Sequence, residues 1–126
     1  MKYCEITLKS GTKIFLGRDA ENNDELVKEF RQKENMIMHT VAPGSPFCVI
    51  ESCGLNPDKK DIKEAAIICA SKSQDWRDNK RDVELNVFTG KDVKKPFLAK
   101  TGTWKITGKA RIIKVKREEI LRLKKE

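Results

Sequence analysis

The stretch DIKEAAIICASKS, residues 61–73, carries the clearest periodic signal in the sequence. Its apolar residues Ile62, Ala65, Ala66 and Cys69 recur at i, i+3, i+4 and i+7, which places one apolar stripe on one face of a helix. Because the stripe consists mainly of small residues, it favours close packing of the helix against a sheet. The fold class then depends on whether the flanking segments predict strands.

Short runs with alternating or continuous apolar character, which are typical of strands, lie on both sides of this helix. They are found at residues 3–8, 14–16, 36–41, 47–52, 83–89, 103–107 and 109–116. Ser10-Gly11 between the first two runs and Gly108 between the last two predict hairpins. The APGSP segment at residues 42–46 cannot continue a strand, because its two prolines remove ladder donors.

Two further segments predict helices. In ENNDELVKEF, residues 21–30, Asn22 or Asn23 is the expected N-cap, and the helix is expected to end near Lys33. REEILRLKKE predicts a short C-terminal helix, with residues 116–126 prone to fraying. The DWRDNKRD segment reads as a polar loop. We therefore expect one α+β domain over residues 1–126, with a largely antiparallel sheet, two packed helices and a short C-terminal helix.

The net charge of +8 is concentrated in one half of the chain. Residues 1–63 hold ten Lys/Arg and ten Asp/Glu, whereas residues 64–126 hold seventeen and nine. Lys91 to Lys116 alone has nine cations against the single Asp92. Such a local excess of positive charge makes a polyanion the leading class of partner.

Several classes of protein are disfavoured by composition. The N-terminal MKYCEITLKSG has neither the apolar core of a signal peptide nor a span long enough for a bilayer, so we expect a cytoplasmic protein without membrane attachment. The four cysteines have no C-x-x-C spacing and the chain has one histidine, so we expect reduced thiols and neither metal nor cofactor.

A few residues are candidates for chemistry or binding. His39 could serve as base to a Cys48 or Cys53 thiolate, but a lone histidine in an apolar strand more often makes a structural hydrogen bond. Arg18, where a strand hands over to a helix, could face a phosphate or be braced by Asp19 or Asp24. Trp76, set among cations, could stack on a nucleobase or fill the core, and Trp104 more often belongs to the core.

Four segments taken together resemble the NFACT-R RNA-binding domain. They are GRDAENNDELVKEF, NMIMHTVAPGSP, DIKEAAIICASKS and VFTGKDVKKPFLAKTG, and they follow the order of the family's motifs. The resemblance covers about residues 11–115. The matching positions are Gly17, Arg18, Asp19, Asn23 and Asp24, then His39, the turn Pro43 to Pro46, then Ala65, Ala66 and Ser73, and finally Lys94, Lys95, Pro96 and Gly102. A tryptophan of the family's strand and a second histidine of its turn are missing, which is similar to the branch linked to tRNA modification enzymes.

This resemblance and the charge pattern imply a non-enzymatic module that contacts phosphates of structured RNA, either tRNA or ribosomal RNA. It would act in ribosome-associated quality control or with a tRNA-modifying enzyme. The residues expected to contact RNA are Arg18, His39, Arg77, Lys80, Arg81, Lys94, Lys95 and Lys100. The alternatives are DNA binding or sensing, sulfur transfer to RNA by a Cys/His enzyme, and an adaptor that docks through the terminal helix.

Overall fold

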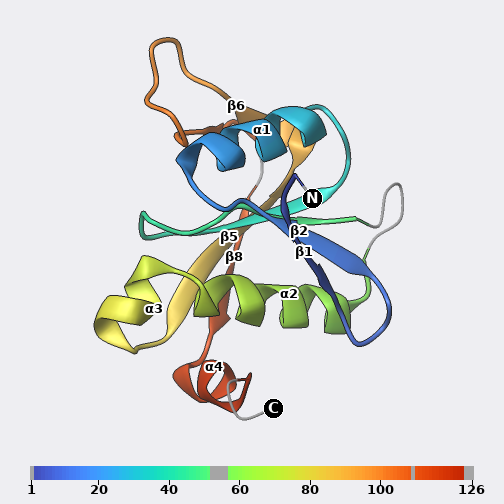
Figure 1. The fold of residues 1–126 in the computed structure, drawn as a ribbon, viewed down its shortest axis with the longest axis vertical. Helices are drawn as coiled ribbons and strands as arrows, with labels where there is room; N and C mark the ends of the chain where they lie inside the picture. The colour runs from blue at the N-terminus through green and yellow to red at the C-terminus, as the bar shows by residue number, and fades with distance from the viewer. Residues whose placement is uncertain (1, 52–56, 109, 124–126) are drawn as a thin grey trace.

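Six strands form one sheet in which all neighbours are antiparallel. The computed structural model describes residues 2–51, 57–108 and 110–123. In sheet order the strands are β1 (Cys4–Thr7), β2 (Lys13–Leu16), β4 (Cys48–Ile50), β3 (Met36–Thr40), β5 (Val83–Thr89) and β8 (Arg111–Val115) (Figure 1). A second, two-stranded sheet pairs β6 (Val93–Lys94) with β7 (Lys105–Ile106). The α+β prediction with a largely antiparallel sheet is therefore confirmed.

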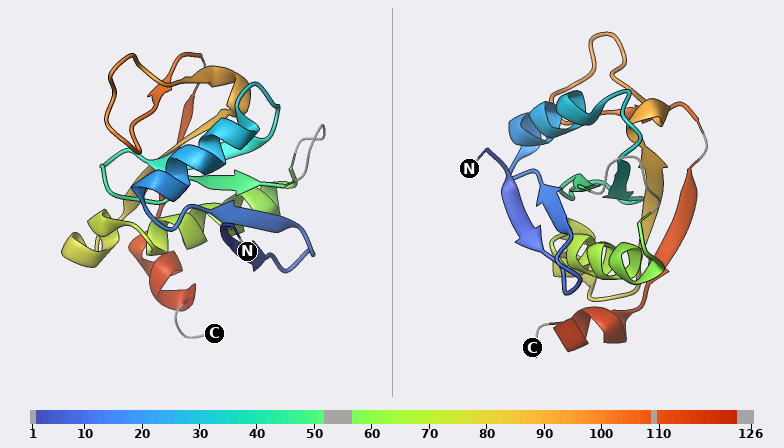
Figure 2. Two further views of the ribbon diagram at one scale, coloured as in Figure 1. Left: turned by 45° about the horizontal axis from the view of Figure 1, so that its top comes forward. Right: turned by 90° about the vertical axis from the view of Figure 1, so that its right-hand side faces the viewer.

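The two main helices cover opposite faces of the large sheet (Figure 2). Helix α1 (Ala20–Phe30) lies on one face and α2 (Lys59–Ser71) on the other. The central strands are apolar on both faces, because Met38 belongs to the core under α2 and its neighbour Ile37 to the core under α1. This double burial explains why residues 36–38 and 48–50 read as continuous apolar runs.

Helix α2 uses the predicted stripe of small residues. Ala65, Ala66 and Cys69 are fully buried in the core beneath the sheet. Asp58 caps the helix by accepting a hydrogen bond from Lys60 N at 3.0 Å. The terminal helix α4 (Arg117–Leu123) buries Ile120 in the same core, which attaches this helix to the rest of the domain.

Helix α1 begins earlier than the sequence predicted. Asp19, and neither Asn22 nor Asn23, is the N-cap, with its carboxylate 2.8 Å from Asn22 N. Asn22 Oδ1 instead accepts from Arg18 N at 2.9 Å. Asn23 is buried and its Oδ1 accepts from Phe47 N at 3.0 Å. The predicted end near Lys33 was also too late, because the helix stops at Phe30.

The segment predicted as a polar loop contains a helix, α3 (Gln74–Asn79). Ser73 Oγ caps it by accepting from Trp76 N at 3.1 Å. Trp76 is only 1% exposed and lies in the core under the sheet. Base stacking by Trp76 was therefore a wrong alternative, because burial of the indole outweighs the polar composition of its neighbours.

The predicted C-terminal hairpin is wrong in its pairing. The segment after Trp104 pairs with β6, where Ile106 lies opposite Val93, and Val93 is buried in the core under α1. Strand β8 pairs with β5 and sets Val115 opposite Val83 in the core under α2. The two halves of the expected hairpin thus bury their apolar residues in different cores. The first hairpin, β1–β2, is confirmed.

Candidate nucleic-acid interface

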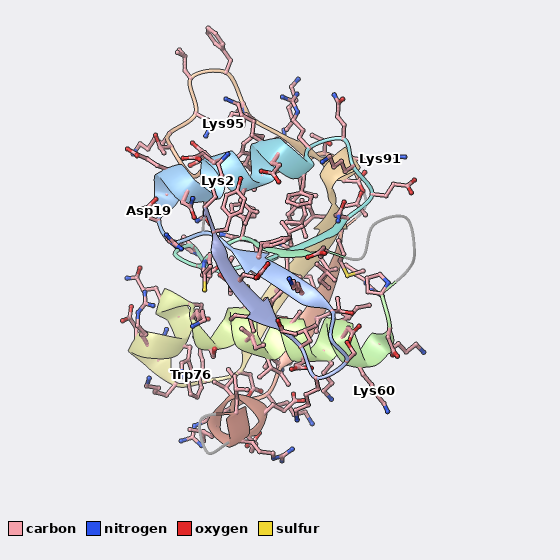
Figure 3. All side chains as sticks on the ribbon, turned by 45° about the vertical axis from the view of Figure 1, so that its right-hand side comes forward. Lys2, Asp19, Lys60, Trp76, Lys91 and Lys95 are labelled. Atoms are coloured by element: carbon pink, nitrogen blue, oxygen red, sulfur yellow. The ribbon has the colours of Figure 1, made fainter. Side chains whose placement is uncertain are left out.

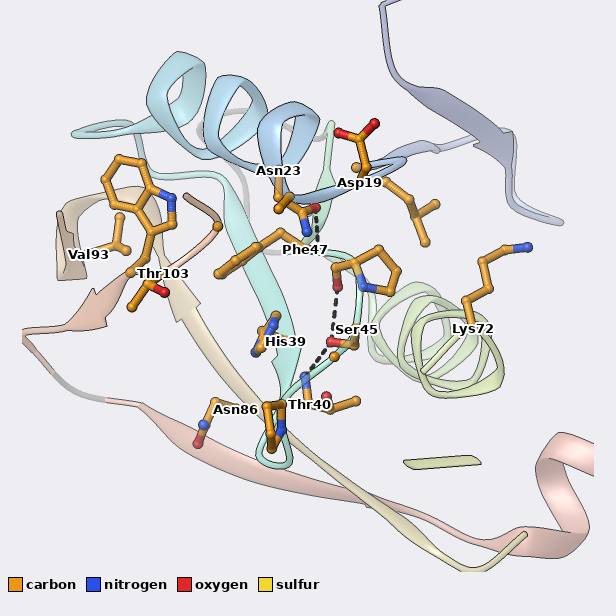
Figure 4. A pocket seen from close by; sticks show the side chains of 18 of the residues that line it. Asp19, Asn23, His39, Thr40, Ser45, Phe47, Lys72, Asn86, Val93 and Thr103 are labelled. Atoms are coloured by element: carbon orange, nitrogen blue, oxygen red, sulfur yellow. Dashed lines mark hydrogen bonds between the residues drawn. The ribbon is translucent and has the colours of Figure 1, made fainter. Parts of the chain in front are cut away.

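A cleft of about 1080 Å³ opens beside the first turn of α1 and the turn between β3 and β4. Residues from the loop between β6 and β7 close its other side. Figure 4 shows the N-cap Asp19, Asn23 of α1, His39 of β3, Asn86 of β5 and Thr103 around this space. The residues that line the cleft range from Cys4 to Ile106, so it combines segments that are distant in sequence.

The first wall of the cleft is the start of α1. Gly17 N donates to Phe47 O at 3.2 Å, and Asn23 Oδ1 accepts from Phe47 N, so this wall is bound to the opening of β4. Arg18 is exposed, and its guanidinium Nη2 donates to the Tyr3 carbonyl at 3.4 Å rather than to Asp19 or Asp24. The predicted carboxylate brace on Arg18 is therefore absent from the described contacts.

The floor carries His39 and Asn86, which are cross-strand partners on β3 and β5. The His39 ring stacks on Phe47 with centroids 4.3 Å apart. Burial lowers the pKa of His39, and its contacts with the backbone of Thr40 and Ser45 only partly oppose this. Because the ordinary value is 6.5, a lowered pKa leaves the imidazole neutral near pH 7. The floor thus offers neutral hydrogen-bonding groups.

Another wall of the cleft is the Pro43–Pro46 turn, which the sequence predicted from its two prolines. Gly44 has a φ of 90°, a left-handed backbone conformation that favours glycine. Gln74 N donates to Gly44 O at 2.8 Å, which joins the turn to the start of α3. This junction brings Lys72 and Arg77 to the rim, with Arg77 Nη1 3.1 Å from Lys72 O.

Positive charge dominates the cleft. Among the described residues that line it, the cations are Arg18, Lys72, Arg77 and Lys105, and the only acidic side chain is Asp19. Asp19 already accepts the capping hydrogen bond of α1. The arrangement of several cations, a helix N-terminus and neutral donors suits a phosphodiester backbone.

The loop of residues 95–104, hereafter loop 95–104, is tied to α1 by one carboxylate. Asp24 Oδ1 accepts from Lys95 Nζ at 2.9 Å, from Gly102 N at 2.8 Å and from Trp104 Nε1 at 2.9 Å. Burial acts to raise the pKa of Asp24, but the hydrogen bonds from Lys95, Gly102 and Trp104 outweigh it and the pKa is lowered. Lys95 therefore has a structural role, and phosphate contact by its ammonium stays a prediction.

The other predicted contact residues are divided between two places. Lys94 and Lys100 are exposed on β6 and on loop 95–104. Lys80 and Arg81 line a second groove that also contains Asp75 and Glu84. Arg81 Nη2 lies 3.0 Å from Asp75 Oδ1, so this groove carries both signs of charge. The cleft collects only Arg18, His39 and Arg77 of the eight predicted residues.

Sequence reasoning missed three residues of the cleft. Lys72 follows the last turn of α2, Lys105 opens β7, and Asn86 is the polar partner of His39 on the adjacent strand. Asn86 stood out only as a polar position in an alternating strand, and the two lysines only as part of the overall positive excess. Their grouping depends on the β6–β7 and β3–β5 pairings, which the sequence did not predict.

Cys48 and Cys69 do not form a catalytic pair with His39. Cys48 lies in the core under α2, whereas His39 faces the cleft on the other side of the sheet. Burial raises the pKa of the Cys48 thiol well above its ordinary value and that of Cys69 to about 12. Cys53 lies outside the described residues.

In residues 2–51, 57–108 and 110–123, no group of three or more His, Cys, Asp or Glu side chains could hold a metal ion. Within the same ranges, no helix has the length and apolar character needed to cross a membrane.

Comparison with known proteins places these features in context. Residues 2–109 match the model of the NFACT protein RNA-binding domain. The archaeal Rqc2 homologue aRqcH of Methanocaldococcus jannaschii is 30% identical over 71 residues, which cover 56% of this chain and 11% of the relative. The chain thus spans about a tenth of that protein. The C-terminal part of the fibronectin/fibrinogen-binding protein from Streptococcus suis shares the fold, with a TM-score of 0.81 and 22% identity over 97% of this chain and 49% of that one.

Proposed function

Since the chain belongs to the NFACT protein RNA-binding domain family, we propose that it is a non-catalytic module that binds structured RNA through the cleft. The observation that carries this proposal is the charge of the cleft. Four cations line it, and its one described acidic residue, Asp19, is occupied as a helix cap. Arg18 would grip a phosphate with its planar guanidinium, and Lys72 and Lys105 would add point charges.

The neutral floor suggests contacts to sugars. His39 and Asn86 sit between the cationic walls, and Thr101 and Thr103 add hydroxyl groups on the loop side. Groups of this kind can donate to or accept from a ribose 2′-hydroxyl, which DNA lacks. We therefore place RNA ahead of DNA, with recognition by shape and backbone more than by base sequence.

The proposed cellular role is based on the archaeal relative. A similar segment occurs in an archaeal Rqc2 homologue, so the module is proposed to act in ribosome-associated quality control in the cytoplasm. The RNA would then be tRNA or ribosomal RNA on a ribosomal surface. A partner enzyme that modifies tRNA is the alternative setting for the same site.

Salt dependence of binding tests the cleft directly. Each phosphate that a cation neutralises contributes roughly −0.7 to −0.9 to the slope of log affinity against log salt. Four such contacts therefore predict a slope of about −3. Replacing Arg18 and Lys72 together with alanine should lower this slope by nearly two units and weaken binding to different RNA stems alike.

The matched control replaces Lys59 and Lys60, two exposed cations at the start of α2. In Figure 3, Lys60 lies on the other side of the molecule from Asp19, which lines the cleft. This control removes the same charge and should leave the slope unchanged. Equal loss in both double variants would show that only net charge matters, and stronger binding of a matched DNA stem would reject the preference for RNA.

A further inference from the structure

Two apolar side chains stand out at the tip of loop 95–104. Phe97 is 92% exposed and Leu98 is 87% exposed, which makes them the most exposed large apolar side chains among the described residues. The loop projects from the body beyond α1, as the orange segment in Figure 1 shows. Neither side chain contributes to a core cluster. Their exposure therefore needs an explanation other than folding.

The backbone at Leu98 strengthens this point. Pro96 to Ala99 form a turn closed by Ala99 N to Pro96 O at 3.1 Å, and Leu98 occupies its third position with a φ of 63°. Glycine or asparagine is the usual residue there, because a left-handed conformation is unfavourable for a bulky side chain.

The next turn of the same loop shows the ordinary solution. Thr103 N donates to Lys100 O at 3.0 Å, and the third position of this turn is Gly102 with a φ of 85°. The loop thus meets the same backbone requirement with glycine in one turn and with leucine in the other. Leu98 carries an exposed side chain at a conformational cost that the fold itself does not repay.

Hydrogen bonds fix the base of loop 95–104, which carries the exposed tip. Lys95 Nζ bonds both Asp24 Oδ1 at 2.9 Å and Lys100 O at 3.1 Å, which joins the two ends of the projecting segment. Gly102 N and Trp104 Nε1 donate to the same carboxylate, which also holds the C-terminal end of the loop. The apolar tip is therefore presented by a braced support, which reduces the entropic cost of binding through it.

The surroundings of the tip point to a nucleic-acid ligand. Lys94 and Lys100 flank it and are exposed, and the sequence contains no acidic residue between Val93 and Arg117. Pro96 and Thr101, on either side of the tip, both line the cleft. A strand whose phosphates lie in the cleft would pass close to Phe97.

We infer that Phe97, supported by Leu98, stacks on an unpaired nucleobase adjacent to the RNA backbone held in the cleft. This inference rests on the proposed function and adds a preference to it. The cleft holds the backbone of any structured RNA, and the tip favours an RNA with a bulged or unstacked base at this site. Stacking on an aromatic ring tolerates any base, so the tip selects structure and not sequence.

The test compares two RNA hairpins of the same stem, one fully paired and one with a single bulged 2-aminopurine. The full chain is expected to bind the bulged RNA more tightly and to quench its fluorescence. Phe97→Ala should remove the quenching and weaken binding of the bulged RNA by roughly 5- to 150-fold, the effect of losing one base–aromatic stack. It should leave the affinity for the paired stem unchanged.

Two further variants serve as controls. Phe97→Trp should retain the quenching and the affinity, because it keeps an aromatic face. Ile112→Ala removes an apolar side chain that is 59% exposed on β8 and should change neither quantity. All three variants should unfold at the wild-type temperature, because each replaces a largely exposed side chain.

The possible failures are separable. Unchanged quenching and affinity in Phe97→Ala would overturn the stacking inference. The cleft proposal would still hold in that case if both hairpins bind with the expected salt dependence. Equal weakening on both hairpins would also overturn it, because the tip would then contact the backbone or another surface. No binding of either RNA by the wild-type chain would reject the proposed function itself.

Discussion

The indole of Trp104 donates a hydrogen bond of 2.9 Å to the carboxylate of Asp24, although the two residues are 80 positions apart. The same oxygen also accepts from Lys95 and Gly102. One aspartate on α1 therefore fixes the position of loop 95–104, and with it one wall of the cleft. The lysine ammonium packs over the Trp104 ring at 5.2 Å, which completes the contact.

Neutralising Asp24 should loosen this attachment. Because the pKa of Asp24 is lowered from 3.8 in the folded chain, its contribution to stability is present above that value and is lost as pH falls through the lower, folded pKa. Asp24→Asn should lower the free energy of unfolding by about 1–3 kcal/mol at neutral pH. Denaturant unfolding at pH 7 and pH 3 measures this, and the difference between variant and wild type should shrink at pH 3. A constant difference would contradict the role of the charge.

Lys94 and Lys95 are adjacent but should behave differently. Lys95 is 28% exposed in its ion pair with Asp24, whereas Lys94 is exposed. We expect Lys95→Met to increase proteolysis of loop 95–104, and Lys94→Ala to weaken RNA binding without changing proteolysis. Limited digestion and RNA titration separate the two effects. Identical behaviour of the two variants would show that the ion pair does not hold the loop.

Trp76 should tolerate phenylalanine. Its Nε1 is buried and has no hydrogen-bond partner in the part of the chain that the structure describes. Phenylalanine removes this unsatisfied donor, worth about 1–3 kcal/mol, and offsets part of the lost packing. Trp76→Phe should therefore be much less destabilising than Trp76→Ala, which should cost about 3–5 kcal/mol. Thermal unfolding ranks the variants, and RNA affinity of Trp76→Phe should equal that of wild type.

His39 should make stability depend on pH in a defined window. Burial lowers its pKa below 6.5, so the unfolded chain binds the proton more readily. Stability contributed by the neutral ring is present above pH 6.5 and is lost as pH falls from 6.5 through the folded pKa. The free energies of unfolding of wild type and His39→Gln should be measured between pH 8 and pH 5. The difference between them should stay constant from pH 8 to pH 7 and should change only at the acidic end. Divergence above pH 7 would mean that the ring is charged in the folded chain.

The buried thiols should react slowly. Burial raises the pKa of Cys48 and Cys69, and a protonated, enclosed thiol is a poor nucleophile. Alkylation at pH 7, followed by peptide mass analysis to resolve each cysteine, should modify these two only at the rate of global unfolding. Rapid modification of Cys48 in the folded chain would revive a thiol-based reaction.

Part of the candidate site was open to prediction. Gly17, Arg18, the Pro43–Pro46 turn and His39 carried the resemblance to the family, and all line the cleft. Trp76 could not be placed, since its polar neighbours hide that Ser73 caps a helix and turns the indole into the core. Lys72 and Lys105 could not be distinguished from solvated lysines, because only the folded chain brings them to one space.

The sequence by itself determined the local elements: the small-residue face of α2, the first hairpin, the alternation of β5 and the concentration of positive charge. These depend on residues a few positions apart, where periodicity and capping act. Only the tertiary structure decided that β7 pairs with β6 and that β8 pairs with β5. It also decided that Asp24 forms an ion pair with Lys95, which lies 71 positions away in the sequence. Such choices depend on which apolar faces share a core and which charges meet, and neither is encoded in any single local pattern.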